Sequence, residues 1–170
     1  IIGPGSTGSA INGGSNGVIN AEIRAFQICF TGSAGAGHMI AGSLSGSNYA
    51  VYTGTGYTID SVISACTTAG IGRGAGHRVT GYVSGCTSAS LYGSNLFLAQ
   101  VSGNGIGFDS SSGNVIGGVV SGNGTGANGG FGVLLPSAVF NGNTRDFNGG
   151  DGGIWTGKGA SLLSTVQVSA

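Results

Sequence analysis

Charged residues, proline and long hydrophobic runs are scarce in this sequence. Its 170 residues include five basic and five acidic residues, so the formal net charge is zero. A nucleic-acid-binding surface needs a stripe of cations that neutralises phosphates. The cations here are few and scattered along the chain: Arg24, Arg73, Arg78, Arg145 and Lys158. We therefore expect no nucleic-acid partner, and a neutral, hydroxyl-rich exterior is compatible with carbohydrate.

Further classes of protein are excluded by what is missing. No stretch approaches the roughly 20 apolar residues of a membrane-spanning helix, so we expect no membrane insertion. Collagen is excluded because the 39 glycines follow no three-residue period and only two prolines are present. The start, Ile1-Ile2-Gly3-Pro4, has neither a basic nor an apolar leader region, and we expect a fragment or a processed piece of a longer protein. With 39% apolar residues and a mean hydropathy of +0.29, the chain should fold as one domain.

The sequence has only three cysteines, Cys29, Cys66 and Cys86. Their number is odd and no two are spaced as C-x-x-C, which argues against a disulfide framework and against a zinc site. Clustered aspartates that could bind calcium are missing as well. We expect no cofactor.

A repeat runs through most of the chain. Its pattern is an apolar residue, three residues, a second apolar residue called here the anchor, then Ser and a small residue. The anchors are Leu44, Ile63, Val83, Val101 and Val120, at intervals of 19, 20, 18 and 19 residues. Degenerate copies extend the series to Ile23 and Phe140. Such a fixed period is typical of solenoids and predicts about seven rungs of 18–21 residues.

Each rung carries a second apolar position seven or eight residues after the anchor. We assign to this second column Phe30, Val51, Ile71, Leu91, Phe108 and Phe147. Two apolar segments per rung, gathered inside one coil, predict an all-β parallel β-helix. We expect this coil over 17–150, an N-terminal extension over 1–16, and a C-terminal cap or oligomerisation segment over 151–170. An insertion is expected at 125–130.

Strand alternation assigns the residues two and four positions before each anchor to the interior. The outward positions of the later rungs then include Leu96, Leu98, Val115 and Val119. Soluble monomers rarely expose such an apolar strip. We expect parallel copies of the chain, in a homotrimer, to cover it; a neighbouring loop is the alternative.

The turns Val101-Ser102-Gly103-Asn104-Gly105 and Val120-Ser121-Gly122-Asn123-Gly124 resemble those of the pectate-lyase-like right-handed parallel β-helices. Bacteriophage tailspikes, polysaccharide-degrading enzymes and some bacterial adhesins share that architecture. The resemblance covers roughly residues 17 to 150 and is most like a tailspike or tail-fibre segment. It implies a turn ladder of asparagines, with Cys66 and Cys86 in the equivalent places of earlier rungs. It also implies receptor binding to a bacterial surface polysaccharide, at the virion tail or an extracellular surface.

A glycosidase needs two carboxylates about 5–10 Å apart. The candidates for a catalytic role are Asp60 and the pair Asp146 and Asp151, which flank one turn beside Arg145. The alternative is that these carboxylates are solvated or ion-paired in turns. A polysaccharide depolymerase, either hydrolase or lyase, is therefore the second functional hypothesis.

Six residues before the anchors stands a column of His38, Tyr57, His77, Asn95 and Asn114. Its rings can form an aromatic stripe that stacks on sugars; the alternative is a turn ladder that satisfies its own hydrogen bonds. Arg78, Tyr82 and Asp60 on neighbouring outward positions complete the expected glycan patch. Trp155, the only tryptophan, is expected to cap the coil or to face a ligand.

Three functional hypotheses remain open: a glycan-binding module of a phage receptor-binding protein, a depolymerase, and a structural spacer of a fibre or adhesin. The register itself makes one further prediction. Cys66 and Cys86 share a column on adjacent rungs with parallel Cβ vectors, which disfavours a disulfide dihedral. We expect two free, stacked thiols.

Overall fold

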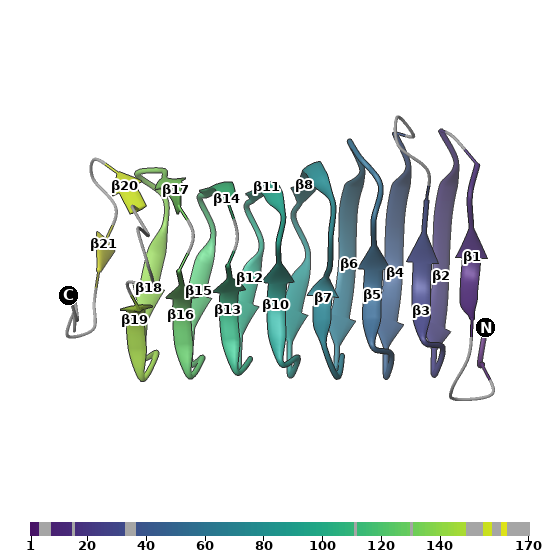
Figure 1. Cartoon of the computed structure of the whole chain (residues 1–170), viewed down its shortest axis with the longest axis horizontal. Coiled ribbons are helices and arrows are strands. Elements are labelled where there is room, and N and C mark those ends of the chain that lie inside the picture. Colours follow the sequence, from purple (N-terminus) through teal and green to yellow (C-terminus); the bar gives the residue numbers. More distant parts are fainter. Residues whose placement is uncertain are drawn as a thin grey trace.

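The computed structural model describes residues 1–3, 8–14, 16–32, 37–110, 112–129, 131–148, 155–157 and 161–162. Its regular elements are all β-strands, and every strand pair is parallel. The strands stack into an elongated β-helix of about seven turns, with β1 at one end and β21 at the other (Figure 1). The predicted fold class is confirmed. Among the described residues, no helix is long and apolar enough to cross a membrane.

Two parallel sheets form the walls of the coil. The anchor sheet contains β2 (Val18–Arg24), β4 (Met39–Ser45), β6 (Thr58–Ser64), β8 (Ala75–Val79), β9 (Tyr82–Ser84), β11 (Ser94–Phe97), β12 (Gln100–Ser102), β14 (Ser112–Ile116), β15 (Val119–Ser121), β17 (Phe131–Leu134), β18 (Val139–Asn141), β20 (Trp155–Gly157) and β21 (Ser161–Leu162). The second sheet contains β1 (Ser9–Asn12), β3 (Ile28–Thr31), β5 (Tyr49–Tyr52), β7 (Ala69–Ile71), β10 (Ser88–Leu91), β13 (Ile106–Asp109), β16 (Thr125–Asn128) and β19 (Arg145–Asn148).

The predicted anchors pair with one another throughout the stack. The paired Cα positions run from Ile23 through Leu44, Ile63, Val83, Val101 and Val120 to Phe140. All seven side chains are fully buried, which confirms the register and the inward face. The coil also reaches the two terminal segments, because β1 pairs with β3 and β21 pairs with β18.

The second column is confirmed with two changes. Ser90, not Leu91, pairs with Ile71 and with Phe108, and its side chain is buried. Leu91 is half-buried beside Asp109. Ala127 holds the same column in the sixth rung. The apolar side chain of Leu91 made it look like the core residue, but the position seven after the anchor points inward in this rung too.

The expected insertion at 125–130 is wrong in its position. Strand β16 lies there and pairs in register with β13 and β19. The additional residues instead lie between Leu134 and Val139, which pair with Ile116 and Val119. A turn containing Pro136 accommodates them at the outer edge of the coil.

A corner forms two residues before each anchor. In the first three rungs one seven-residue strand passes through it, and from the fourth rung on the strand is divided in two there. The corner column consists of Ala21, Gly42, Ser61, Gly81, Ala99, Gly118 and Ala138. A Cβ atom on Gly81 would lie 2.1 Å from the Ser61 carbonyl oxygen, and one on Gly118 would lie 2.0 Å from that of Ala99. The close approach of neighbouring backbones therefore requires glycine in alternate rungs.

Candidate functional site

The column of His38, Tyr57 and His77 lies inside the coil. All three side chains are at most 3% exposed, so they do not form the surface stripe that we expected. A glycine three residues earlier makes room for two of the rings: a Cβ atom on Gly54 would lie 1.8 Å from the Tyr57 hydroxyl, and one on Gly74 2.3 Å from His77 Nε2. The rings of Tyr57 and His77 therefore pack against the backbone at these glycines.

Side chains of this column accept hydrogen bonds from backbone N–H groups of the preceding rung, which confirms the alternative of a turn ladder that satisfies its own hydrogen bonds. The Gly17 N–H donates to His38 Nδ1 at 3.0 Å, and the Tyr57 N–H donates to His77 Nδ1 at 3.1 Å. The series continues with asparagines: His77 N–H donates to Asn95 Oδ1 and Asn95 N–H to Asn114 Oδ1. Tyr57 and His77 stack with ring centroids 4.6 Å apart. The column has the geometry of an internal ladder.

Burial sets the electrostatics of this ladder. It lowers the pKa of His77 to about 4 and raises the pKa of Tyr57. A neutral His77 is also what the geometry needs, because Nδ1 accepts a hydrogen bond and must carry a lone pair. In the described part of the chain, buried Tyr57 Oη and His77 Nε2 have no hydrogen-bond partner.

The candidate catalytic carboxylates are not brought together. Asp60 is exposed on the outer face of β6 and accepts a hydrogen bond from Thr80 Oγ1 at 3.2 Å. Asp146 is fully buried on β19 and accepts one from Asn143 Nδ2 at 2.9 Å. Four rungs separate them, about 19 Å along the coil axis, which is too far for a glycosidase pair. Asp151 lies outside the described residues.

Asp146 closes a second internal ladder. The backbone N–H groups of Cys86, Asn104 and Asn123 donate to the Oδ1 atoms of Asn104, Asn123 and Asn143 at 2.9–3.0 Å. Each asparagine also donates from Nδ2 to the carbonyl of an anchor, at Val83, Val101 and Val120. The asparagine ladder implied by the resemblance is thus present. Asp146 is part of it, neither solvated nor free for chemistry at the surface.

The other predicted glycan-binding residues do share one outer face. Arg78 pairs in register with Thr58 and Tyr82 with Val62, which places both beside Asp60. Asp60 and Arg78 are exposed, and Tyr82 is half-buried with its hydroxyl 2.7 Å from Ser102 Oγ. Trp155 lies on β20 and pairs through its backbone with Gly132; its side chain lies outside the described atoms.

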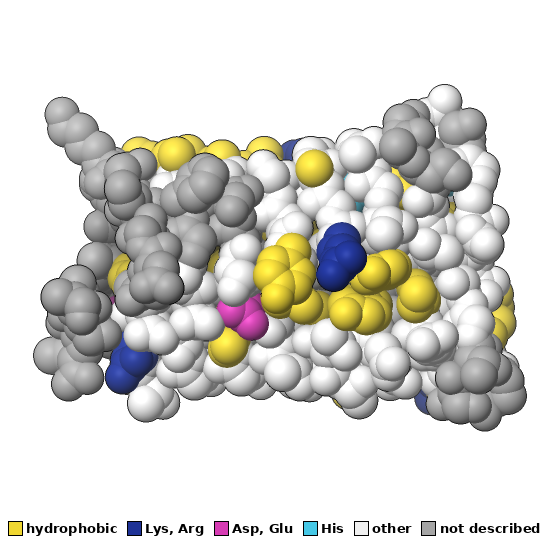
Figure 2. Space-filling view, in the orientation of Figure 1, with side chains coloured by type: hydrophobic (Ala, Val, Ile, Leu, Met, Phe, Trp, Pro, Cys, Tyr) yellow, Lys and Arg dark blue, Asp and Glu magenta, His cyan; other side chains and the backbone are white. Residues whose placement is uncertain are grey.

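Sequence reasoning missed an aromatic patch on the second sheet. We call it the tyrosine patch: Tyr49, Tyr52, Arg73 and Tyr92. The rings of Tyr49 and Tyr52 have centroids 4.6 Å apart and cover Gly72, where a Cβ atom would lie 2.7 Å from Tyr52. The Arg73 guanidinium lies 6.0 Å from the centre of the Tyr92 ring, which is 56% exposed. Hydrophobic side chains and a basic one lie together near the middle of this face (Figure 2).

A signal for this patch was present in the sequence. Tyr52 ends β5, and Arg73 and Tyr92 come shortly after the ends of β7 and β10, the corresponding strands of the next two rungs. The columns that recur in all rungs belong to the interior of the coil, whereas the tyrosine patch is confined to three rungs and does not stand out in the repeat. The tyrosine patch differs from these columns because its tyrosines are not repeated at the same positions in the other rungs.

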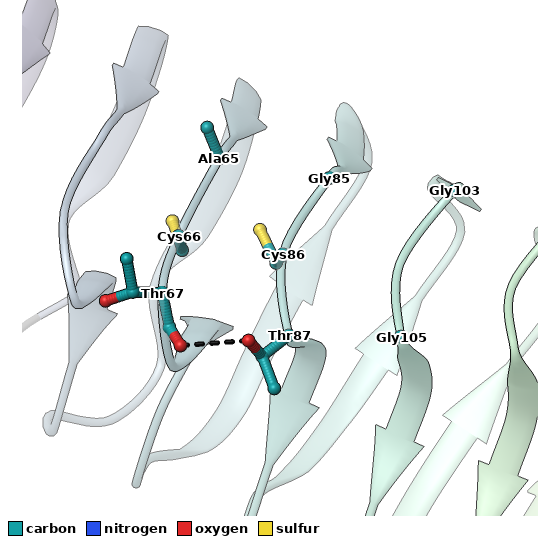
Figure 3. A pocket seen from close by; sticks show the side chains of 8 residues that line it. All are labelled: Ala65, Cys66, Thr67, Gly85, Cys86, Thr87, Gly103 and Gly105. Atoms are coloured by element: carbon teal, nitrogen blue, oxygen red, sulfur yellow. Dashed lines mark hydrogen bonds between the residues drawn. The ribbon is translucent and has the colours of Figure 1, made fainter.

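A shallow groove lies over the turns that follow β6, β9 and β12. We call it the thiol groove; its volume is about 550 Å³ and it is lined by Ala65, Cys66, Thr67, Gly85, Cys86, Thr87, Gly103 and Gly105 (Figure 3). Cys66 and Cys86 are free and buried, as predicted. Within the described chain, no group of three His, Cys, Asp or Glu side chains is arranged to hold a metal ion.

No family model, curated protein or solved structure matches the chain.

Proposed function

We propose that this chain is a glycan-binding β-helix and that the tyrosine patch holds the sugar. The observation that carries the proposal is that three tyrosines and an arginine lie together on one face of three consecutive rungs, with Arg73 and Tyr92 exposed and Tyr49 and Tyr52 half-buried. Aromatic faces pack against the C–H surfaces of sugar rings, and Arg73 supplies hydrogen-bond donors for hydroxyl or carboxylate groups.

The rigidity of the coil supports this role. The rung of Tyr49 and the rung of Tyr92 are two steps apart, which is about 10 Å. A chain of linked sugars lying along the coil axis could contact the rings in turn. Because Tyr49 and Tyr52 are held on β5 with their rings packed together, little of their side-chain freedom is lost on binding, which favours affinity.

The biological setting that we propose is the recognition of a bacterial surface polysaccharide by a phage tailspike or tail-fibre segment, at the virion tail or another extracellular surface. The regular coil and the hydroxyl-rich exterior, with a formal net charge of zero for the chain, favour it. The depolymerase alternative is weakened by the separation of Asp60 from Asp146. The spacer alternative predicts no glycan binding at all.

The test is a glycan array of bacterial capsular and O-antigen polysaccharides, followed by calorimetry on any glycan that binds. The double variant Tyr52→Ala/Tyr92→Ala should weaken binding by about ten-fold or more, since 1.4 kcal/mol of lost contact gives that factor. Tyr82→Ala, on the other sheet, is the matched control and should bind as the unaltered chain does.

Two results would contradict the proposal. If the unaltered chain binds none of the polysaccharides, the spacer hypothesis is favoured. If Tyr82→Ala loses binding while the double variant keeps it, the sugar lies on the anchor sheet beside Asp60 and Arg78.

A further inference from the structure

The two thiols of the thiol groove occupy equivalent positions on adjacent rungs. Ser64 and Ser84, two residues earlier, pair in register, and the Thr87 N–H donates to the Cys66 carbonyl at 3.1 Å on the other side. Each Sγ donates to the carbonyl two residues before it, at 3.7 Å for Cys66 and 3.4 Å for Cys86. The same local hydrogen bond means the same side-chain direction, as Figure 3 shows.

The spacing of the coil decides which chemistry this pair suits. Equivalent atoms on adjacent rungs lie about 4.8 Å apart. A disulfide needs its sulfurs at about 2.05 Å, so both side chains or the backbone would have to move. A metal ion held in line between two thiolates, with bonds of roughly 2.3 Å each, needs its sulfurs about 4.6 Å apart. The repeat distance of the β-helix fits the second arrangement.

We propose that Cys66 and Cys86 form a two-coordinate site for a soft monovalent cation of the Cu(I) class. Thiolates are the ligands that such cations select. The described residues offer no third or fourth ligand nearby, which disfavours the tetrahedral geometry of zinc. Both cysteines line the thiol groove together with Gly85, Gly103 and Gly105, so an ion in the groove lies next to the two residues.

Binding at this site is coupled to protons and to no electron transfer. A cysteine thiol ordinarily carries its proton at neutral pH, whereas the metal ligand is the thiolate. One Cu(I) ion displaces two protons to solvent and leaves a bis-thiolate with one negative charge.

The test is an anaerobic competition for Cu(I) between the protein and a chromophoric Cu(I) chelator. The unaltered chain should withdraw one equivalent. Cys66→Ser and Cys86→Asn should each weaken Cu(I) binding by about 100-fold, because one of two soft ligands is lost. Both substitutions copy a residue of the same column, Ser47 or Asn104, so the fold should be kept; circular dichroism checks this.

Cys29→Ser is the matched control, because Cys29 is also free and buried but stands outside this column. It should withdraw Cu(I) as the unaltered chain does. The proposal is overturned if the unaltered chain withdraws no Cu(I), or if folded Cys66→Ser or Cys86→Asn withdraws as much as the control. Its outcome is independent of glycan binding.

Discussion

At the scale of single residues, the stability of the folded coil depends on the protonation state of a buried side chain, that of His77. Its ring stacks on Tyr57 and accepts the Tyr57 backbone N–H through Nδ1. Protonation would replace that acceptor with a donor facing another donor. The surrounding apolar side chains also disfavour a charge.

The folded chain should therefore lose stability as the pH falls from about 6.5 to about 4. His77 takes up its proton near pH 4 when folded, against 6.5 for the ordinary side chain, so the unfolded state binds more protons in this range. Stability is fully present above pH 6.5, and about 3 kcal/mol is lost by pH 4. Urea unfolding at a series of pH values measures this loss.

His77→Asn is the control for this titration, because Asn95 and Asn114 show that the column accepts asparagine. The variant should lack the loss of stability between pH 6.5 and 4. An unchanged pH dependence would mean that other groups cause it.

At the scale of residues, both the anchors and the direction of the histidine column were predictable from strand alternation. Each anchor sits within a strand, where side chains alternate between two faces and one apolar residue fixes the parity. The histidine column lies six residues before the anchor and has the same parity: in β8, His77 and Val79 are buried and Arg78 between them is exposed. The expectation of a surface stripe did not extend the alternation to this position. Gly54 and Gly74 are a second signal, since a glycine three residues before a ring leaves space for it.

At the scale of the structural element, the asparagine ladder binds successive turns of the coil together. Asn123 illustrates its connections: it accepts the Asn104 backbone N–H and donates to the Val101 carbonyl. These groups are buried, so each bond removed leaves a polar atom without water or partner.

Asn123→Ala should lower the free energy of unfolding by about 2–3 kcal/mol, because it leaves a buried donor and a buried acceptor unsatisfied. Asn128→Ala is the comparison: Asn128 bonds Asp109 on the outer face and is half-buried, so we expect a loss of about 1 kcal/mol or less. Denaturant unfolding of both variants measures the difference. Equal losses would show that the internal ladder contributes no more than a surface one.

The errors of sequence reasoning at this scale have a common cause. Ser90 was passed over for Leu91, and the extra residues between Leu134 and Val139 were assigned to 125–130. In both places, apolar character was used to place a residue. Backbone hydrogen bonding between rungs instead fixes the register, and it tolerates a serine or an alanine in the core where neighbouring rungs supply large side chains.

At the scale of the whole molecule, one border of the coil is more apolar than a soluble surface usually is. Leu98, Val119 and Val133 are 36–45% exposed on the outer side of successive rungs, next to half-buried Leu96 and Val115. Hydrophobic side chains follow this border over β11, β14 and β17 (Figure 2). We propose that parallel copies of the chain pack here as a homotrimer.

Size-exclusion chromatography with light scattering should give the mass of three chains at micromolar concentration. Val119→Lys should shift the mass to one chain, because it places a charge in the proposed contact. Val62→Lys changes a valine of comparable exposure at the same strand position in a rung outside the strip, and should leave the trimer intact. A single-chain mass for the unaltered protein would refute the assembly.

The alternation at the corner column makes two turns, not one, the true building block of the molecule. Gly42, Gly81 and Gly118 recur every other turn, and the backbone of the turn before each one occupies the space that a side chain would need. Tandem duplication or loss of a single turn would set two like turns against each other and break this parity. A coil of this kind can grow or shrink smoothly only in steps of about 38 residues, twice its visible period.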